Sequence, residues 1–330
     1  MITPLNLPPD LCMKEESIFL SCIVPGRSNP KQRIDVYLQP LIAELKQLWF
    51  DGVETFDVSK KQNFIMRAAL MWTIGDFPAY SMMSGWSTAG KIACPVCMDE
   101  VKSFRLQHGG KQSWFDVARR FLPPDHPYRR DRKKFRRGRV ELQSAPVQKT
   151  GEQILETIER LGLRKITEEN GQEVNDEICK VHDCGWRKRS LFWDLPYWKD
   201  LMVRHNLDVM HIEKNVFENV FNTVLDVQGK TKDNAKARED IAIYCSRREL
   251  ERDSRTGRYP KAGYALDKAQ RKAFLDWVGK LKFPDGYVSN LGRCVDPTKL
   301  RMFGMKSHDC HVFMQRLLPI GFKNFLPKRV

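Results

Sequence analysis

The sequence predicts a mixed α/β fold, and three observations support this prediction. Apolar residues recur at helical spacing in residues 34–50 and again in residues 209–225. Shorter apolar runs, such as residues 17–24 and 62–74, are typical of strands. Hydrophobic residues make up 42% of the 330-residue chain, which is sufficient for a substantial core. We therefore expect one large domain or two medium ones.

Residues 1–100 are expected to alternate strands with helices. The expected elements are a strand at 17–24, an amphipathic helix at 34–50, a buried strand at 62–74, a short helix or turn at 80–86 and a short strand at 93–98. The length of the run at 62–74 leaves a helix open as the alternative. A polar, charge-rich insertion follows at residues 101–190, with an isolated helix at 152–161. The remaining regions are a core helix segment at 191–228, a mainly helical extension at 229–304 with a helix at 265–281, and the start of a C-terminal domain at 305–330.

Two carboxylates occupy positions where an apolar residue is expected. Asp76 ends the apolar run that closes with Gly75, and Glu213 falls within the apolar arc of the helix at residues 209–225. A carboxylate in an apolar layer is costly unless it is paired or binds a metal ion, so the two together indicate a divalent-metal site for phosphoryl chemistry. Two alternatives stay open: Asp76 can form a turn or cap a helix, and Glu213 can be a structural carboxylate paired with a basic residue of the insertion.

The order of these elements favours one α/β architecture. Strand, strand, helix, a strand ending at Asp76, an insertion and a helix carrying Glu213 match an RNase H-like core. In that fold, strand ends and one flanking helix bring carboxylates to the same edge of the sheet.

The cysteines indicate a zinc site. Two cysteines separated by two residues can share one tetrahedral zinc ion, and two further ligands must come from elsewhere. The four candidate ligands are Cys94, Cys97, His205 and His211. A weaker set is Cys179, Cys184 and His182, and a pair of reduced cysteines without metal is the plain alternative. We expect His308 and His311 to be structural.

The charge of the chain favours a polyanionic partner. The net charge is +15 and the isoelectric point is about 9.4, which is typical of nucleic-acid-binding proteins. Of the 56 lysine and arginine residues, eight lie within residues 129–139: Arg129, Arg130, Arg132, Lys133, Lys134, Arg136, Arg137 and Arg139. This run can bind DNA phosphates, act as a nuclear localisation signal, or be a solvated loop. The nearby aromatic residues Trp114, Phe115, Phe121 and Tyr128 can supply stacking or packing.

The composition also indicates the cellular compartment. We expect no membrane association, because no apolar run is long enough to span a bilayer. Nine cysteines at irregular spacings do not indicate a secreted disulfide framework. A reducing compartment therefore fits better, and the basic run favours the nucleus.

Several strings resemble the transposases of plant CACTA (En/Spm) elements. They include IDVYLQPL at 34–41, GDFPAY at 75–80, ACPVC at 93–97 and RHNLDVMHIEKNV at 204–216, and the resemblance extends over nearly the whole chain. It implies a cut-and-paste DNA transposase with an RNase H-like core and a triad of carboxylates that holds Mg²⁺ or Mn²⁺. Asp76 corresponds to the second carboxylate and Glu213 to the third. The resemblance also supports the four zinc ligands named above.

The sequence departs from this family at several points. The first catalytic aspartate of the family lies upstream of the segment that begins here at Met1, so we expect this chain to lack that strand and to be catalytically impaired. Asp35 is a candidate substitute. Val117-Ala118 stands where the family often has Cys-His, and Glu239 where it usually has Leu.

We therefore expect a transposase-derived protein of uncertain enzymatic activity. Its partners are DNA, as transposon ends or non-specifically, and either a second copy or a full-length transposase. The alternative is a non-catalytic DNA- or protein-binding module or a non-functional relic.

Overall fold

The computed structural model describes residues 1–167 and 170–327 and divides into two compact units. Unit 1 comprises Met1–Val101 and Pro146–Leu207, and unit 2 comprises Lys102–Ala145 and Asp208–Val330. The chain passes from one unit to the other after residues 101, 145 and 207. The expected insertion at residues 101–190 is thus shared between the units. The last residues of the expected region 305–330 lie outside the described residues.

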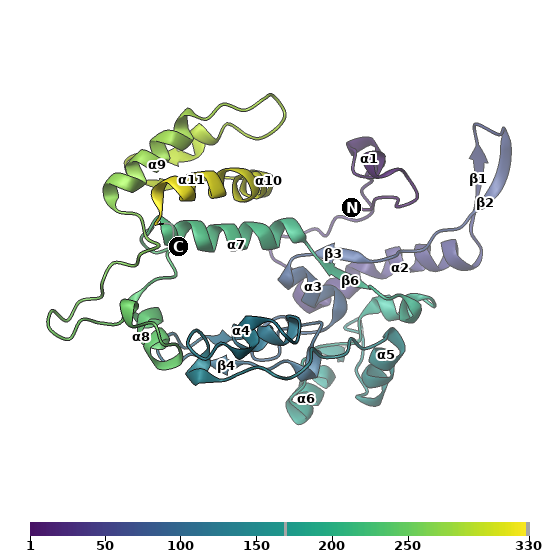
Figure 1. Ribbon diagram of the computed structural model, residues 1–330. Coiled ribbons are helices and arrows are strands. Elements are labelled where there is room, and N and C mark those ends of the chain that lie inside the picture. Colours follow the sequence, from purple (N-terminus) through teal and green to yellow (C-terminus); the bar gives the residue numbers. More distant parts are fainter. Residues whose placement is uncertain (168–169, 328–330) are drawn as a thin grey trace. The chain divides into compact units, whose positions relative to one another are not determined.

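Unit 1 contains most of the longer elements of the N-terminal half (Figure 1). Its helices are α1 Pro9–Cys12, α2 Ile34–Phe50, α3 Phe77–Ser84, α5 Gly151–Arg160 and α6 Gly171–His182. Its strands are β1 Val53–Asp57, β2 Gln62–Met66, β3 Thr73–Gly75 and β6 His205–Leu207.

The core of unit 1 joins α2, α5 and the segment of residues 186–198. Leu38, Ile42 and Leu45 lie one helical turn apart on the buried face of α2, as its apolar spacing predicts. They pack in one cluster with Ile158 of α5 and with the aromatic side chains Trp186, Phe192 and Trp198. This aromatic segment, more than any sheet, therefore organises unit 1.

The parallel pair β3–β6 links two distant parts of unit 1. Thr73 pairs with His205 and Gly75 with Leu207, and the two strands lie side by side at the beginning of α3 (Figure 1). Tyr197 reinforces this link, because its hydroxyl accepts a hydrogen bond from the N–H of Leu70 at 2.9 Å.

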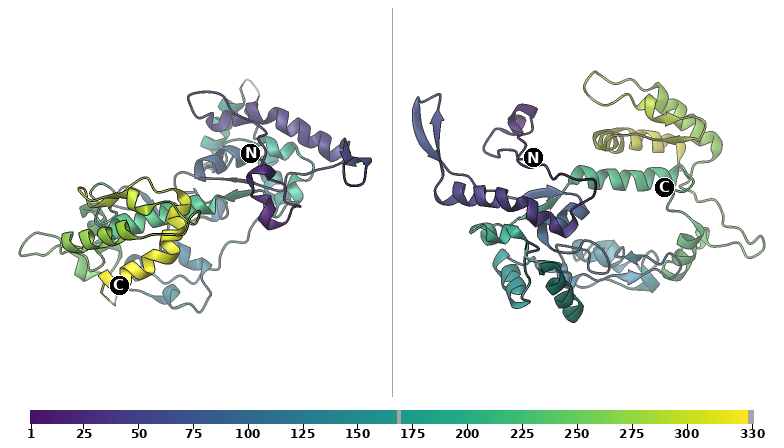
Figure 2. Two further views of the ribbon diagram at one scale, coloured as in Figure 1. Left: turned by 90° about the horizontal axis from the view of Figure 1, so that it is seen from above. Right: turned by 180° about the vertical axis from the view of Figure 1, so that it is seen from behind.

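The expected strands at 17–24 and 93–98 are wrong, and the one expected at 62–74 is correct only at its two ends. Residues 17–24 form no ladder apart from a bridge between Ile2 and Phe19, and the side chains of Phe19, Leu20 and Ile23 are exposed. Residues 62–74 are two strands joined by a loop. The first, β2, forms an exposed hairpin with β1 that extends beyond α2 in every view (Figures 1 and 2). Residues 93–98 form a turn instead of a strand.

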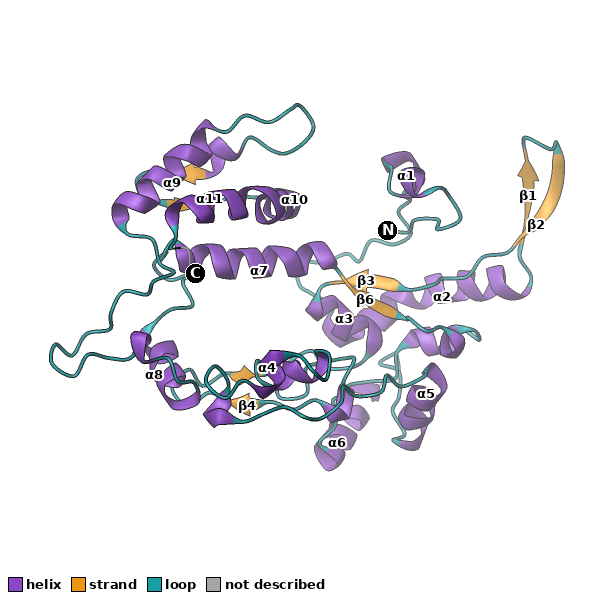
Figure 3. Cartoon of the chain, in the orientation of Figure 1, coloured by secondary structure: helices purple, strands orange, loops and turns teal. Residues whose placement is uncertain are grey.

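Unit 2 is built mainly of helices and loops (Figure 3). Its helices are α4 Pro127–Arg130, α7 Val209–Val224, α8 Ala235–Tyr244, α9 Lys268–Lys280, α10 Ser307–Val312 and α11 Leu318–Phe325. Its strands form two short antiparallel pairs, β4 Phe104–Arg105 with β5 Gln112–Ser113 and β7 Val295–Asp296 with β8 Arg301–Met302. A π-helical segment, Phe313–Leu317, joins α10 to α11.

The core of unit 2 is an aromatic cluster between α7, α9 and the π-helical segment. Phe217 and Phe221 stack with ring centroids 4.9 Å apart, and both contact Phe313. Phe274 of α9 completes the cluster and is fully buried. The helices at residues 34–50, 152–161, 209–225 and 265–281 are all confirmed to within a few residues.

The structure is a mixed α/β arrangement, in which the sheets of the described residues are two-stranded pairs. An RNase H-like core stays a prediction. Within the described residues, no helix is both long enough and apolar enough to cross a membrane.

Candidate functional site

Asp76 directly follows β3 and is the N-cap residue of α3. Its Oδ1 accepts a hydrogen bond from the N–H of Ala79 at 2.8 Å, which closes the first turn of the helix. The capping role that the sequence left open is therefore present. This hydrogen bond engages only one of the two carboxylate oxygens of Asp76. A catalytic role of Asp76 stays a prediction.

The far end of α3 is also fixed. Gly85 ends the helix in a left-handed conformation with φ of 81°, where a Cβ atom would lie 2.4 Å from the carbonyl oxygen of Lys188. The N–H of Arg187 donates to the carbonyl of Gly85 at 2.7 Å. The segment around Lys188 thus holds α3, and with it Asp76, in place.

Glu213 lies on the packed face of α7, together with Phe217 and Phe221. Its Oε2 contacts Nδ1 of His311 in α10, the helix that packs on α7. The partner of this carboxylate is therefore a histidine of the C-terminal region and not a basic residue of the insertion. Only part of the expected apolar arc is buried; the exposed members are Val209, Ile212, Val216 and Val220.

Cys94 and Cys97 lie in a tight turn of unit 1. The N–H of Met98 donates to the carbonyl of Cys94 at 2.9 Å, and the N–H of Cys97 donates to the Cys94 sulfur at 3.3 Å. Two cysteine sulfurs held in one turn, two residues apart, can share one tetrahedral zinc ion. The turn is thus compatible with two zinc ligands.

His205 is enclosed by aromatic rings in unit 1. Its ring centroid lies 5.5 Å from that of Tyr80, 5.7 Å from that of Phe192 and 5.4 Å from that of Trp198. Its Nδ1 lies 2.7 Å from the hydroxyl of Thr73. Burial, aided by the charge of Arg204, lowers the pKa of His205 to about 3, so the imidazole is neutral at physiological pH.

The remaining zinc candidates differ in their surroundings. His211 lies in the first turn of α7 in unit 2, and its N–H donates to Asp208, the N-cap residue. In the weaker set, the sulfur of Cys179 contacts the carbonyl of Trp186, and burial raises the pKa of Cys179 to about 11. Zinc binding by this set would have to overcome the raised pKa, because a cysteine ligand must be deprotonated.

Asp76, Cys94 and Cys97 lie in unit 1 and Glu213 lies in unit 2, all within the part of the chain that the structure describes. There, no three or more His, Cys, Asp or Glu side chains are grouped so as to hold a metal ion. The binding of Mg²⁺, Mn²⁺ or zinc by this chain stays a prediction.

The basic run contains one residue that is not a DNA contact. Arg129 is only 3% exposed, and its guanidinium donates to the carbonyls of Arg120, Leu122, Glu141 and Gln143 at 2.7–3.2 Å. Its hydrogen-bond donors therefore serve the backbone, and the expectation of a phosphate contact is corrected for this residue.

Arg119, which sequence reasoning missed, acts in the same way. It is 4% exposed and donates to the carbonyls of Asp116, Tyr128 and Arg139. The two buried arginines hold an irregular loop together where few strand hydrogen bonds exist. The exposed cations of the run are Arg130, Arg132, Lys133, Lys134, Arg137 and Arg139. The side chain of Arg136 lies outside the described part.

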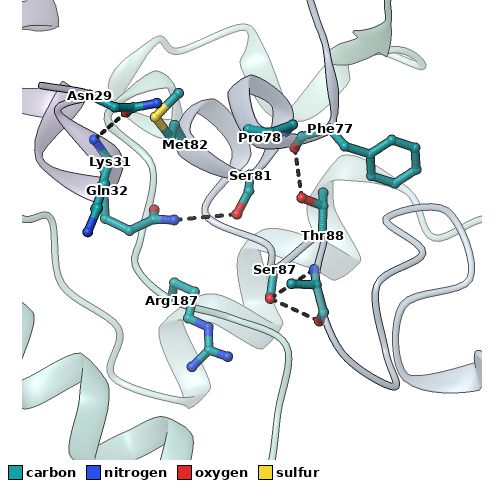
Figure 4. A pocket seen from close by; sticks show the side chains of 11 residues that line it. Asn29, Lys31, Gln32, Phe77, Pro78, Ser81, Met82, Ser87, Thr88 and Arg187 are labelled. Carbon is teal, nitrogen blue, oxygen red and sulfur yellow. Dashed lines mark hydrogen bonds between the residues drawn. The ribbon is translucent and has the colours of Figure 1, made fainter. Parts of the chain in front are cut away.

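A groove with a volume of about 480 Å³ lies beside α3 in unit 1 (Figure 4). Lys31 and Arg187 supply positive charge, and the lining includes three hydroxyl groups, those of Ser81, Ser87 and Thr88. Phe77 and Pro78, which immediately follow Asp76, also line it. The hydroxyl of Thr88 donates to the carbonyl of Phe77 at 2.7 Å, and that of Ser87 donates to the carbonyl of Ala89 at 3.3 Å, so these two hydroxyl groups serve the backbone. No local sequence pattern connects Lys31 with Arg187, so sequence reasoning missed the groove.

Among known protein families, one family model matches the first part of the chain. Residues 1–161 match the model described as Transposase family tnp2. The matched range includes Asp76, Cys94, Cys97 and the basic run, and the match supports a transposase-derived protein. No match was found among the curated proteins or among the solved structures.

Proposed function

We propose that this transposase-derived chain binds DNA and derives from a CACTA-type cut-and-paste transposase. The observation that carries the proposal is the group of exposed cations between Arg130 and Arg139, which lies within the range matched by the transposase family. Such side chains bind phosphates along a DNA backbone without reading the sequence. The net charge of +15 supports attraction to DNA as a whole.

The buried arginines support this role indirectly. Arg119 and Arg129 together donate to carbonyls between residues 116 and 143, so the loop that carries the exposed cations has a defined backbone. Cations presented by an ordered backbone lose less conformational entropy on binding than those of a disordered tail. Nuclear import through the same run stays a prediction.

A second candidate function is DNA strand cleavage. The observation that favours it is the position of Asp76 directly after β3, a strand in a parallel pair. Open α/β sheets place their functional groups outside the carboxyl ends of such strands. Asp76 and Glu213 would be two carboxylates of the triad that the family resemblance implies. Binding ranks ahead of cleavage because the exposed cations of the basic run are themselves described, whereas the triad rests on the family resemblance.

Binding is tested by the anisotropy of a fluorescent duplex over a range of salt concentrations. We expect the triple variant Arg130→Ala, Arg132→Ala, Lys133→Ala to lower the slope of log K against log salt by about 2–3, because each phosphate contact contributes about 0.9. A matched control removes three exposed cations from elsewhere in unit 2: Lys272, Lys280 and Lys282. Equal effects of the two triple variants would contradict a specific contact by the basic run.

Cleavage is tested by nicking of supercoiled DNA in the presence of Mg²⁺ or Mn²⁺. Asp76→Asn is the informative variant, because asparagine caps a helix about as well as aspartate but is a much weaker metal ligand. Nicking by the wild-type chain that disappears in Asp76→Asn and in Glu213→Gln would support cleavage. A folded, DNA-binding wild-type chain that never nicks would leave binding as the function.

A further inference from the structure

Four aromatic rings of unit 2 form a continuous row, which we call the ring surface: Phe115, Phe135, Tyr128 and His126. Phe115 stacks on Phe135 with ring centroids 6.1 Å apart and an interplanar angle of 19°. Phe135 lies 6.1 Å from Tyr128, and Tyr128 lies 5.1 Å from His126. Residues from separate parts of the segment 102–145 are thus brought together in one row.

Exposure separates this row from an ordinary hydrophobic core. Phe115 is 41% exposed and Tyr128 is 48% exposed, although both rings are held by neighbouring rings. By contrast, the rings of the unit 2 core, such as Phe274 and Phe313, are fully buried. The ring surface therefore presents aromatic area to solvent.

Cations lie against the same rings. The guanidinium carbon of Arg119 lies 4.0 Å from the centroid of Phe135, and the ammonium of Lys134 lies 5.2 Å from that of Tyr128. Lys134 is itself exposed, as are its sequence neighbours Arg132 and Lys133. Exposed rings and exposed cations therefore occur together in one short segment.

Local hydrogen bonds hold Tyr128 in a defined position. Its backbone N–H donates to Nδ1 of His126 at 3.1 Å, and its carbonyl accepts a hydrogen bond from Arg119 at 3.0 Å. A ring on such a backbone stacks on a partner at a smaller entropic cost than a ring on a loose loop.

We propose that the ring surface binds single-stranded DNA, with unpaired bases stacking on Tyr128 and Phe115 and the backbone held by the adjacent cations. Single-strand-binding proteins combine these two features, because every base has an aromatic face and every nucleotide has a phosphate. In a duplex the base faces are stacked on one another, so exposed rings gain little from it. This inference rests on the proposed DNA-binding function and adds to it a preference for unpaired nucleotides.

The test compares the binding of the full chain to a labelled single strand and to a duplex of the same length. For the single strand we expect Tyr128→Leu and Phe115→Leu each to weaken binding about tenfold, in line with the contribution of one stacked base. For the duplex we expect little change, because the basic residues are intact. Leucine keeps an apolar side chain, and a thermal unfolding curve confirms that each variant is folded.

Tyr287→Leu is the matched control. Tyr287 also lies in unit 2, is 44% exposed and stacks on another ring, Phe283, at 6.3 Å. Its replacement is expected to leave binding to both DNA forms unchanged.

The outcomes separate the two proposals. If the wild-type chain binds duplex but Tyr128→Leu binds the single strand as well as wild type, the ring surface has no such role while the proposed function stands. An equal loss on both DNA forms would also overturn the preference for unpaired bases. Failure of the wild-type chain to bind any DNA would instead refute the proposed function itself.

Discussion

Lys188 Nζ lies 2.6 Å from Asp35 Oδ1, and both side chains are shielded from solvent inside unit 1. The ammonium also donates to the carbonyl of Gln32 at 2.9 Å. Burial raises the pKa of Asp35 and lowers the pKa of Lys188, and the attraction between the two charges opposes both shifts. Because Lys188 holds this carboxylate in the interior, Asp35 is not placed to replace a catalytic aspartate. That expectation is corrected.

Breaking the Asp35–Lys188 pair is expected to destabilise unit 1 strongly. Lys188→Met leaves a buried carboxylate without its counter-charge, which costs about 3–5 kcal/mol in free energy of unfolding. The double variant Asp35→Leu, Lys188→Met removes both charges and is expected to be more stable than Lys188→Met alone. Urea unfolding followed by circular dichroism measures both. Additive losses in the double variant would show that the two residues are not coupled.

His205, which is enclosed by aromatic rings, predicts a dependence of stability on pH. The pKa of His205 is about 3 in the folded chain and about 6.5 in the unfolded chain. Between these values the unfolded state binds more protons, so stability falls as the pH falls from about 6.5 towards 3. The loss is at most about 1.4 kcal/mol per pH unit from this residue.

Unfolding in urea at pH 7, 6 and 5 measures this effect. His205→Gln removes the titrating group and is expected to flatten the dependence, although the variant starts from a lower stability. His182→Gln is the control, because His182 is an exposed histidine of the same unit. An unchanged pH dependence in His205→Gln would contradict the assignment.

Arg129 and Arg130 are adjacent cations with different expected roles. Arg129→Ala leaves several backbone carbonyls without a donor and is expected to destabilise unit 2 by more than about 2 kcal/mol. Arg130→Ala, at an exposed position, is expected to change stability by less than about 0.5 kcal/mol but to weaken DNA binding. Unfolding curves and DNA titrations of both variants distinguish the roles. A stable Arg129→Ala variant with impaired DNA binding would show instead that Arg129 contacts DNA.

Zinc at the Cys94–Cys97 turn is tested by metal analysis of the purified chain. We expect about one zinc ion per chain, lost on chelation and lost in the variant Cys94→Ser, Cys97→Ser. The variant Cys179→Ser, Cys184→Ser is expected to retain the ion. A zinc-free wild-type chain, purified without chelator, would leave the turn as a structural feature of reduced cysteines.

Several helices could be predicted from the sequence, because the residue patterns that determine them lie within the helix itself. α2 has the predicted bounds, and its buried residues follow the apolar spacing. α5 and α9 each begin with a capping box, from Thr150 with Gln153 and from Asp267 with Gln270, and such pairs are visible in the sequence. The helix α6 at Gly171–His182 was not predicted, although its signal is also local.

The strands and part of the site depended on distant partners. Residues 17–24 have a strand-like composition but pair with no other strand beyond one bridge. Their composition alone therefore gave a wrong strand prediction. Arg129 was indistinguishable from Arg130 in the sequence, because its carbonyl partners lie up to 14 residues away in an irregular loop. The contact between Glu213 and His311 spans 98 residues, which no local pattern reveals.

The interleaving of the two units has a consequence for the order in which the chain can fold during synthesis. Thr73 and His205, which join the two parallel strands, are 132 residues apart. The ribosome must therefore release most of the polypeptide before unit 1 can close, and by then residues 102–145 of unit 2 have already emerged without the helices that complete them. A messenger RNA that ends near codon 161 would encode an incomplete part of each unit. In that product Asp35 would have no counter-charge, because Lys188 is not encoded.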